Sequence, residues 1–464
     1  MLSTAPHTDL ATQMQGRLVT PADSDWDAVR QPFNVTADLR PEAIALPRDA
    51  DDVIAAVAYA REQGLRVAAQ ATGHNAKPYG SLEGALLVDV RELQEVSVDP
   101  AAQRVRVGAG VKWERVAPLL AEHGLAALHG SSPDVGIAGY SLGGGMGWLA
   151  RKYGLQANSV TAIELVTADG RLARVDADHE PELFWALRGG NGNFGVVTAI
   201  EFAVYPVAQL YAGTLFFGLE QAGAVLRAWT ALLPDLPDEM MTWIKLMRFP
   251  DIPDVPAEVR GQAFTIVFGA FLGGEEHGRE LLAPVRALGP AVDTFAMAPP
   301  EVLGDMAMDP PDPLPYLSAT ALLDDLPASG VDALVAVAGA DSGSTLTMVE
   351  FRHLGGALAR RAPGAGARAS LPGEIVMFSL GVPQDEESAR VVQAELDAVS
   401  RAVEPFKVGD YPNFVEAEGD ARGFFDEDTW ARLRLVKALY DPSEVFRGNH
   451  PIPPAHVHSI EVRA

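Results

Sequence analysis

The sequence predicts an α+β protein in two parts. It has 464 residues, of which 48% are hydrophobic, and a chain of this size can bury one large core or two moderate ones. Between residues 38 and 206, short apolar runs alternate with stretches of helical spacing. After Pro206 the predicted strands become longer and alternate with full helices. The second part is therefore predicted to be an antiparallel sheet covered by helices.

Charge and cysteine content narrow the function. Lys and Arg number 36 against 62 Asp and Glu, for a formal charge of -26. Such a charge repels polyanions, so nucleic acid and anionic membrane surfaces are poor partners. The absence of cysteine excludes disulfides, thiolate catalysis and Cys-ligated metal sites, and we predict no metal centre. Neither a signal-peptide pattern nor a run of about 18 apolar residues is seen, so a cytoplasmic protein is expected.

The first part places a histidine-bearing loop directly after a strand. A strand at 43–46 leads to acidic residues suited to a helix start, and Gly64 closes that helix. The next strand, 65–71, runs into Thr72-Gly-His-Asn75. Further elements are predicted as strands at 85–90, 94–98 and 104–107, a helix at 112–122, a hairpin at 163–175, a helix at 180–187 and a strand at 196–204.

The second part is predicted from fewer and longer elements. Strands are expected at 213–218, 264–271, 345–351 and 374–380, and helices at 275–288 and 386–403. Residues 296–330 are rich in Pro and Asp and predict a long loop. A last helix is expected at 427–439.

Two glycine motifs suggest other chemistries. Gly190-x-Gly-x-x-Gly195 matches a dinucleotide fingerprint, but here a helix precedes it and a strand follows, the reverse of the required order. Gly139-x-Ser141-x-Gly143 matches the nucleophile elbow of a serine hydrolase. The elbow needs a strong strand before the serine and a helix after it. Here 136–139 predicts only a weak strand, and interior glycines disfavour the helix.

A third interpretation is that the glycines let the backbone approach a ligand closely. Unhindered N–H groups suit a pyrophosphate, whereas a tight loop between packed elements is the plainer alternative. His74 alone is more often an ordinary loop residue, and it gains weight from these neighbouring glycine runs.

Several motifs together resemble the berberine-bridge-enzyme-like oxidases of the vanillyl-alcohol-oxidase/PCMH flavoprotein superfamily. The resemblance is dense over 38–206 and 405–453 and weak between them. The matching stretches are Arg40-Pro-Glu-Ala-Ile, Thr72-Gly-His-Asn75, Leu87-Val-Asp-Val90, Val107-Gly-Ala-Gly110, Val135 through Gly147, Arg151-Lys-Tyr-Gly154, Val166-Thr-Ala-Asp-Gly170, Leu183 through Gly190, Phe194-Gly-Val-Val-Thr198, Tyr411-Pro-Asn-Phe414 and Asp441 through Asn449.

The resemblance implies the domain organisation and the cofactor. A PCMH-type FAD-binding domain of two α/β subdomains would span 1–206, a substrate domain 207–410, and 411–464 would return to the first. His74 matches the histidine that bonds the flavin 8α-methyl group, which raises the reduction potential. The FAD contacts implied with it are Ala71, Thr72, Gly73, Asn75, Ser132, Val135, Gly136, Gly139, Ser141, Gly144, Gly147, Val197, Tyr411 and Asn449.

Two positions refine the expected type. Many relatives add a second flavin bond from a cysteine where this chain has Ser132, so a single covalent bond is expected, as in bacterial members of the 6-hydroxynicotine-oxidase type. Val135 matches a position where a small residue leaves room for oxygen, which favours an oxidase that releases hydrogen peroxide. It is equally well explained as a packed β-branched residue.

The resemblance makes Tyr411 a catalytic candidate. Its ordinary pKa of about 10 is too high for a base at pH 7, so a neighbouring cation, for which Arg352 is one candidate, or the flavin's own field would have to lower it. Strand alternation places Glu350 and Arg352 on one face and His353 on the other. A structural ion pair is an equal alternative for the first two. Asn413 and Tyr140 are further candidates for the pocket.

The leading hypothesis is an FAD oxidase of a natural product, phenol, alcohol, amine or sugar, with O2 as acceptor, acting as a monomer or homodimer. Oxidative ring closure on a biosynthetic intermediate is the alternative within the family. A serine hydrolase using Ser141 and a flavin-binding protein without turnover are the alternatives outside it.

Overall fold

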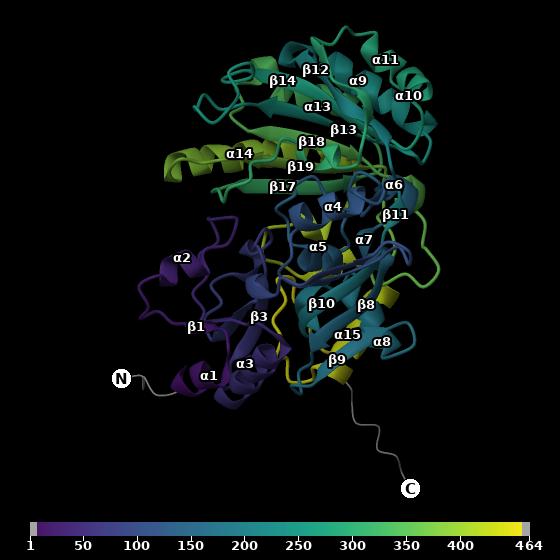
Figure 1. Cartoon of the computed structure of the whole chain (residues 1–464). Helices are drawn as coiled ribbons and strands as arrows, with labels where there is room; N and C mark the ends of the chain where they lie inside the picture. The colour runs from purple at the N-terminus through teal and green to yellow at the C-terminus, as the bar shows by residue number, and fades with distance from the viewer. Residues whose placement is uncertain (1–6, 457–464) are drawn as a thin grey trace.

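Two lobes, one above the other in Figure 1, make up residues 7–456, which are the residues that this computed structural model describes. The lower lobe holds two sheets and the N-terminal half of the chain. The upper lobe is a single large sheet with helices on its outer face (Figure 1). The predicted α+β class is confirmed.

The first sheet of the lower lobe ends at the histidine-bearing loop. Its strands lie in the order β1 (Arg17–Val19), β2 (Ala43–Leu46), β4 (Ala85–Asp89) and β3 (Arg66–Gln70). β2 and β3 both pair in parallel with β4, every residue of which is buried. Helix α3 (Ala50–Gln63) links β2 to β3. Asp49 caps its start by accepting from the N–H of Asp52, and Gly64 ends it in a left-handed conformation.

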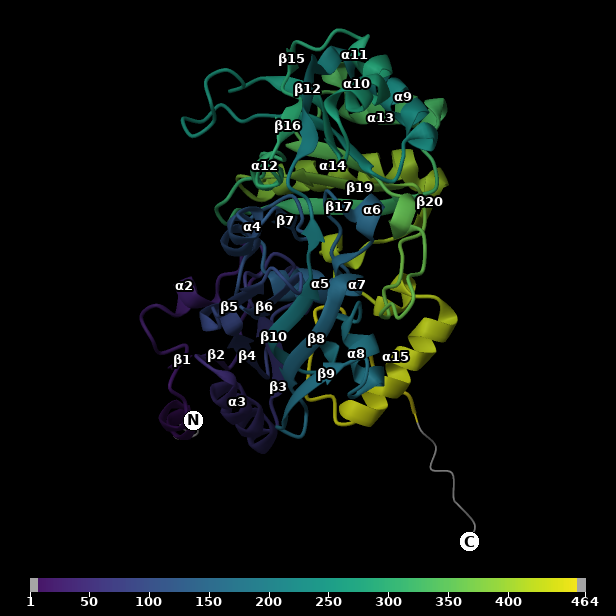
Figure 2. The ribbon, with the colours of Figure 1, turned by 45° about the vertical axis from the view of Figure 1, so that its right-hand side comes forward.

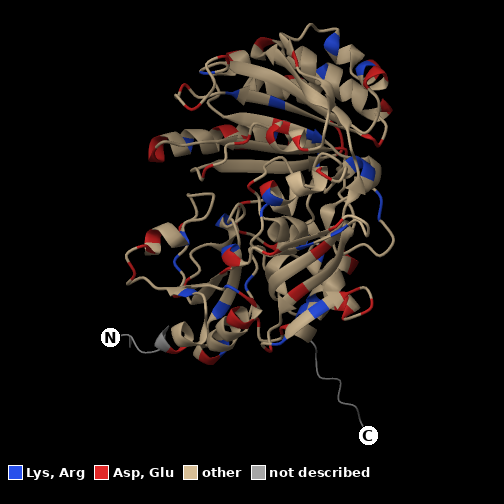
Figure 3. Ribbon diagram, viewed as in Figure 1, with Lys and Arg blue, Asp and Glu red and all other residues tan. Residues whose placement is uncertain are grey.

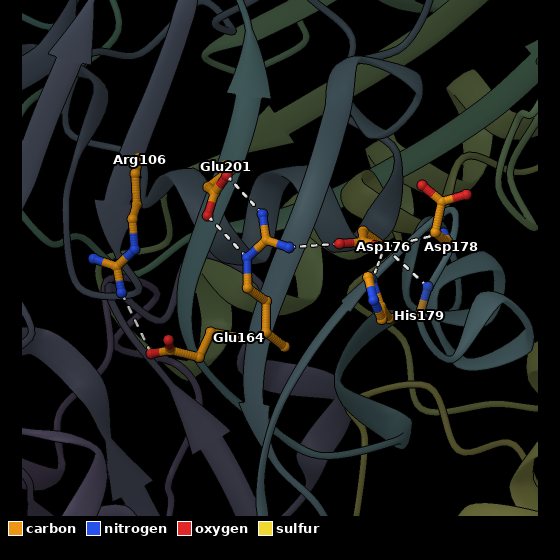
Figure 4. Close-up of polar contacts among 7 residues, drawn as sticks. Arg106, Glu164, Asp176, Asp178, His179 and Glu201 are labelled. Atoms are coloured by element: carbon orange, nitrogen blue, oxygen red, sulfur yellow. Dashed lines mark hydrogen bonds and ion pairs between the residues drawn. The ribbon is translucent and has the colours of Figure 1, made fainter.

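The second sheet is antiparallel, in the order β5 (Val96–Asp99), β6 (Arg104–Gly108), β10 (Val196–Ala203), β8 (Val160–Val166) and β9 (Leu172–Asp176). Charged side chains pair across one face (Figure 4). Arg174 contacts Glu201 at 3.1 Å, and Arg106 contacts Glu164 at 3.4 Å. A hydrogen bond from His179 lowers the pKa of Asp176 to about 2. Such exposed pairs add little stability, about 0–1 kcal/mol each.

Short helices surround these sheets. Strands β7 (Leu125–Ala126) and β11 (Tyr205–Pro206) form a small two-stranded sheet. The helices are α1 (His7–Gln13), α2 (Trp26–Arg30), α4 (Trp113–Ala121), α5 (Ile137–Gly143), α6 (Ala150–Tyr153), α7 (Gln156–Ser159) and α8 (Pro181–Leu187). Of these, α4, α5, α6 and α7 lie on the side toward the upper lobe (Figure 1).

The upper sheet is antiparallel throughout. Its strands, in spatial order, are β15 (Val292–Asp293), β12 (Leu210–Gly218), β14 (Ala263–Phe271), β13 (Met240–Arg248), β18 (Met348–His353), β19 (Ile375–Gly381), β17 (Leu317–Leu323) and β20 (Lys407–Gly409), with β16 (Ala296–Ala298) also paired to β12. Its helices are α9 (Ala222–Leu232), α10 (Glu275–Leu281), α11 (Ala283–Arg286), α12 (Val302–Asp305), α13 (Ala328–Ala338) and α14 (Glu386–Val403).

Strand alternation divides the residues of this sheet between two cores. Ile244 and Val349 pack with α9, α13 and α14 in an outer apolar core. Trp243 and Met247 face the lower lobe and pack with Trp148 in an inner core. Side chains two residues apart share a face, so the inner face of the sheet forms a wall opposite the lower lobe.

The C-terminal segment returns to the lower lobe, where α15 (Glu427–Tyr440) lies beside α8 (Figure 2). The N–H of Val67 in β3 donates to the carbonyl of Val445 at 2.7 Å, and the N–H of Arg447 donates back to Val67 at 2.9 Å. These bonds place the C-terminal segment against the strand that leads into the His74 loop.

Three local predictions were wrong. The long loop expected at 296–330 contains β16, α12, all of β17 and the start of α13, because β17 completes the sheet between β19 and β20. The helix expected at 275–288 is broken at Leu282, next to Pro284, whose ring disfavours continuation of the helix. The weak strand expected at 136–139 is the beginning of helix α5.

Lysines and arginines are dispersed over both lobes among acidic residues (Figure 3). Among the helices of residues 7–456, none is both long and apolar enough to span a bilayer.

Candidate active site

A large cavity lies where the lobes meet, and most of the predicted site residues line it. It encloses about 2020 Å³ of empty space, its open mouth included. The predicted residues in its lining are Ala71, Thr72, Gly73, His74, Asn75, Ser132, Val135, Gly136, Gly139, Tyr140, Val197, Arg352, Tyr411, Asn413 and Asn449.

The His74 ring is held by three neighbours. Its Nδ1 lies 2.8 Å from the Thr72 hydroxyl, and its Nε2 lies 3.1 Å from Oδ2 of Asp134. Phe33 stacks on the ring with centroids 3.9 Å apart. Gly73 makes this turn possible, because its φ is +76° and an added Cβ would lie 2.5 Å from Pro32. The imidazole is thus oriented by the Thr72 hydroxyl and the Phe33 ring, while its Nε2 faces Asp134 without a hydrogen bond to the described residues.

Asparagines tie this loop to the C-terminal segment. The Asn75 amide donates to the carbonyls of Pro412 and Asn413, at 3.0 and 3.1 Å. Asn449 donates to the side chain of Asn75 at 2.8 Å. Asn413 donates to the Tyr140 carbonyl at 3.0 Å, and its Oδ1 has no partner among the described residues.

Two glycines in the cavity wall face open space. At Gly139 and at Gly192 an added Cβ would meet no protein atom within 4 Å, and both glycines line the cavity. The missing side chains therefore widen the cavity itself, rather than making room for packed protein. This arrangement fits a flat cofactor lying against backbone.

A chain of buried charges closes the upper wall. Lys245 Nζ lies 3.0 Å from both Asp309 and Glu350, and Glu350 also pairs with Arg352. Ser132 donates to Asp309 at 2.7 Å. Burial alone would lower the pKa of Lys245, but the two carboxylates outweigh it and raise that pKa. Burial likewise opposes ionisation of Asp309, yet Lys245 and Arg352 lower its pKa to about 2.

Arg352 and Glu350 share a face, as strand alternation predicts, but only Arg352 reaches the cavity. The guanidinium lies 3.9 Å from the Trp243 ring and 5.1 Å from the Phe414 ring, and it donates to Ser131 at 3.3 Å. Glu350 is fully buried behind it. His353 is on the other face, where it contacts Arg151 at 2.9 Å.

Tyr411 is a hydrogen-bond donor in this environment. Burial raises its pKa well above 10, against the charges of Arg368 and Arg352 and the nearby N–H groups of Gly145 and Met146. Its hydroxyl has no hydrogen-bond partner within the described chain. The expectation that a cation would make Tyr411 a base is therefore not met, because desolvation of the phenolate outweighs both guanidinium groups.

Four predicted residues lie behind the cavity wall. Besides Glu350, Ser141 is buried and donates to the Ile137 carbonyl at 2.7 Å. Gly144 packs against Arg368 and Tyr411, and Gly147 approaches the His129 carbonyl so closely that a Cβ there would clash. Ser141 thus sits inside helix α5 with its hydroxyl occupied, which excludes the nucleophile-elbow interpretation.

The remaining candidates have narrower roles than expected. Tyr140 lines the cavity, but its hydroxyl donates to the Leu128 carbonyl at 2.9 Å, and burial raises its pKa well above 10. The Gly190–Gly195 run connects α8 to β10, in the order helix then strand, so it is not a dinucleotide fingerprint.

A hydrogen-bonded group at the lobe boundary was missed. Glu416 accepts from Tyr316 at 2.5 Å and from Asn34 at 2.7 Å. The Tyr316 hydroxyl also lies 3.2 Å from the His74 carbonyl oxygen. Burial raises the pKa of Glu416 to about 7, against the hydrogen bonds from Tyr316 and Asn34. No sequence pattern joins three residues this far apart in the chain.

Asp134 and Lys245 were missed as well. Asp134 lies directly before the Val135–Gly147 motif and carries no signal of its own. Lys245 did carry one, because a lysine inside the apolar strand Met240–Arg248 requires buried partners.

Comparison with known proteins identifies the family. Residues 41–176 match the FAD binding domain family, and residues 410–453 match the family described as berberine and berberine like. (R)-6-hydroxynicotine oxidase of Paenarthrobacter nicotinovorans is 30% identical over 96% of this chain and 98% of its own length. This chain belongs to the berberine-bridge-enzyme-like FAD-linked oxidases. The xylooligosaccharide oxidase of Thermothelomyces thermophilus is 26% identical, over 94% of this chain and 91% of its own length.

Solved structures of this FAD-linked oxidase family have the same fold. The crystal structure of 6-hydroxy-D-nicotine oxidase from Arthrobacter nicotinovorans aligns with a TM-score of 0.83 at 26% identity, over 98% of this chain and all of that one. A BBE-like protein of Physcomitrella patens aligns with a TM-score of 0.85 at 20% identity, over 98% of this chain and all of that one. The oxidase described here is thus an FAD-dependent oxidoreductase.

Proposed function

We propose that this oxidase carries FAD on a single covalent bond from His74 and oxidises a small organic molecule, with O2 as the final electron acceptor. The observation that carries the proposal is the oriented imidazole of His74 in the glycine-widened cavity. Ser132, the position where relatives place a second attachment, instead donates to Asp309 at 2.7 Å. A bound flavin would supply hydride acceptance from a substrate C–H bond.

The residues around the cavity divide the remaining tasks. Thr72 holds the His74 ring through Nδ1, and Asp134 faces its Nε2. Tyr411 stays protonated near neutral pH and can donate a hydrogen bond to the substrate. Arg352 provides a fixed positive charge at the cavity wall, held by Glu350. Val135 is part of the lining and would leave oxygen access there.

Acid precipitation tests the attachment. The wild-type protein, produced with ample riboflavin, should keep its yellow colour in the washed pellet, and mass spectrometry should place the flavin on the His74 peptide. The His74→Ala variant should release its flavin into the supernatant. His179→Ala is the matched control, because that histidine is exposed and pairs with Asp176 away from the cavity. A wild-type pellet without flavin would refute covalent attachment.

Oxygen use is tested separately. Substrate-reduced protein mixed with aerobic buffer should regain its oxidised spectrum and release one hydrogen peroxide per flavin. Val135→Leu should slow this reoxidation without changing anaerobic reduction. Equal reoxidation rates in the wild type and in Val135→Leu would show that Val135 does not control oxygen access.

A further inference from the structure

We propose that the substrate is a compact, mainly apolar molecule that presents an oxygen acceptor, bound most tightly as a carboxylate, and that carbohydrates are excluded. This inference rests on the proposed oxidation at the same cavity and names the class of molecule that the cavity takes. It follows from two observations on the upper wall. The wall is apolar over most of its area, and two hydrogen-bond donors at its edge, the Tyr411 hydroxyl and Nη1 of Arg352, have no acceptor among the described residues.

The apolar area is built by strand register. Met247 pairs with Met348, and Met348 pairs with Leu380, so the three side chains form a row across β13, β18 and β19. All three line the cavity, and Phe378, Met308 and Leu314 extend the same surface. Methionine side chains adapt to the shape of an apolar ligand and contact aromatic rings favourably.

A sugar would fit this wall poorly. Each hydroxyl pressed against the Met247–Met348–Leu380 row would lose its hydrogen bonds to water without gaining another, which is unfavourable for every group buried in this way. An apolar ring or chain gains from the same contact. The wall thus selects for a substrate with few polar groups.

The next row of the wall is charged but internally paired. Lys245 pairs with Glu350 in the sheet, and its ammonium group contacts Glu350, Asp309 and the Ala307 carbonyl at 2.9–3.0 Å. Asp309 accepts from both Lys245 and Ser132. Since these carboxylates already have partners, they are poor sites for a cationic substrate group.

Two donors are left for a ligand. The Tyr411 hydroxyl has no partner among residues 7–456, and the described chain forms no hydrogen bond to Nη1 of Arg352. Both residues line the cavity, and both lie against Phe414, with Tyr411 and Phe414 ring centroids 5.1 Å apart. Two neighbouring donors, one of them charged, match an oxygen acceptor and favour an anionic one.

Ligand titrations on the flavin-loaded full chain test this inference. We would follow the visible flavin spectrum with phenylacetate, phenylacetamide, phenethylamine and xylobiose. Phenylacetate should cause a saturable change at the lowest concentration and phenylacetamide at a higher one. Phenethylamine should bind at least about tenfold more weakly than phenylacetate, because it lacks the charge-assisted acceptor. Xylobiose should cause no saturable change.

Two substitutions separate the two halves of the inference. Arg352→Met should weaken phenylacetate binding about 10- to 100-fold, the range for loss of a hydrogen bond to a charged group. Its effect on phenylacetamide should be smaller. Arg422→Met is the control, because Arg422 is exposed on the lower lobe. Leu380→Asn should weaken both aromatic ligands, whereas Leu439→Asn, at an exposed leucine, should not.

The inference is overturned if xylobiose binds as tightly as phenylacetate, or if phenethylamine binds more tightly. It is also overturned if Arg352→Met and Leu380→Asn, both yellow and folded, bind phenylacetate as the wild type does. Failure of covalent attachment shows elsewhere, as loss of colour from the acid-precipitated pellet. The two failures are therefore distinguishable.

Discussion

Glu416→Gln should change the pH dependence of stability by about 3 kcal/mol. The carboxyl is buried at the lobe boundary, and its pKa is raised from 4.5 to about 7 in the folded protein. In the unfolded chain it returns to its ordinary value. The difference of about 2.5 pKa units, at about 1.4 kcal/mol each, corresponds to about 3.5 kcal/mol in total, of which about 3 kcal/mol is lost between pH 4.5 and 8.5.

The direction follows from proton binding. Between pH 4.5 and 7 the folded protein keeps the Glu416 proton and the unfolded chain has lost it. Stability from this group is therefore fully present below pH 4.5, falls as the pH rises, and is lost above pH 7. Glutamine does not titrate, so the variant lacks this decline. Its altered hydrogen bond to Asn34 adds an offset that does not depend on pH.

Urea unfolding at several pH values between 4.5 and 8.5 measures the effect. The stability of Glu416→Gln relative to wild type should rise by about 3 kcal/mol across this range. Glu418→Gln, two residues along and exposed, should show a flat difference. A difference for Glu416→Gln that stays constant within about 0.5 kcal/mol would refute the account of a buried carboxyl that holds its proton.

The protonation state of Glu416 determines which acceptor is available to the Tyr316 hydroxyl. Protonated Glu416 can donate to the Tyr316 oxygen, which leaves the Tyr316 hydroxyl free to donate to the His74 carbonyl, 3.2 Å away. Ionised Glu416 accepts that hydrogen bond itself.

Three further substitutions test the fold. Asp441→Ala leaves a buried lysine unpaired and should cost about 3–5 kcal/mol in urea unfolding; a loss below about 1 kcal/mol would contradict this. Leu396→Ala opens a cavity in the outer core and should cost about 2–5 kcal/mol, and an unchanged Tm would count against that core. Gly73→Ala should lower flavin content, since it combines a φ of +76° with a clash against Pro32, whereas Gly274→Ala, in open space, should not; equal flavin content would show that the loop tolerates a side chain.

Local periodicity was enough to predict the sharing of a face by Glu350 and Arg352. A strand alternates whatever sheet it joins, so the two side chains had to lie together, and they do. The same reasoning separated His353 from them. It gave no information on which of the pair would reach the cavity, because that depends on Lys245 from a neighbouring strand occupying the space behind Arg352.

Amino-acid composition gave a wrong prediction for β17, which follows a segment rich in Pro and Asp. Residues 309–315 contain half of the Pro and Asp of the stretch predicted as a loop, and Leu317–Leu323 begins two residues after Pro315. The place of β17 in the sheet depends on pairing with β19 and β20, one on each side, and those strands come later in the chain. Sheet membership of this kind is a long-range property that a local window does not contain.

The glycine run shows how one pattern can serve two purposes. Gly139 faces open cavity, whereas Gly143 and Gly147 allow Asn413 and the His129 carbonyl to approach the backbone closely. Both kinds of glycine look alike in the sequence. At the first kind a Cβ would project into the cavity, and at the second kind it would clash with packed atoms. Only the second kind fixes how Asn413 and the His129 carbonyl pack against this segment. Open space in the cavity and close packing of the surrounding chain are therefore encoded in the same short segment.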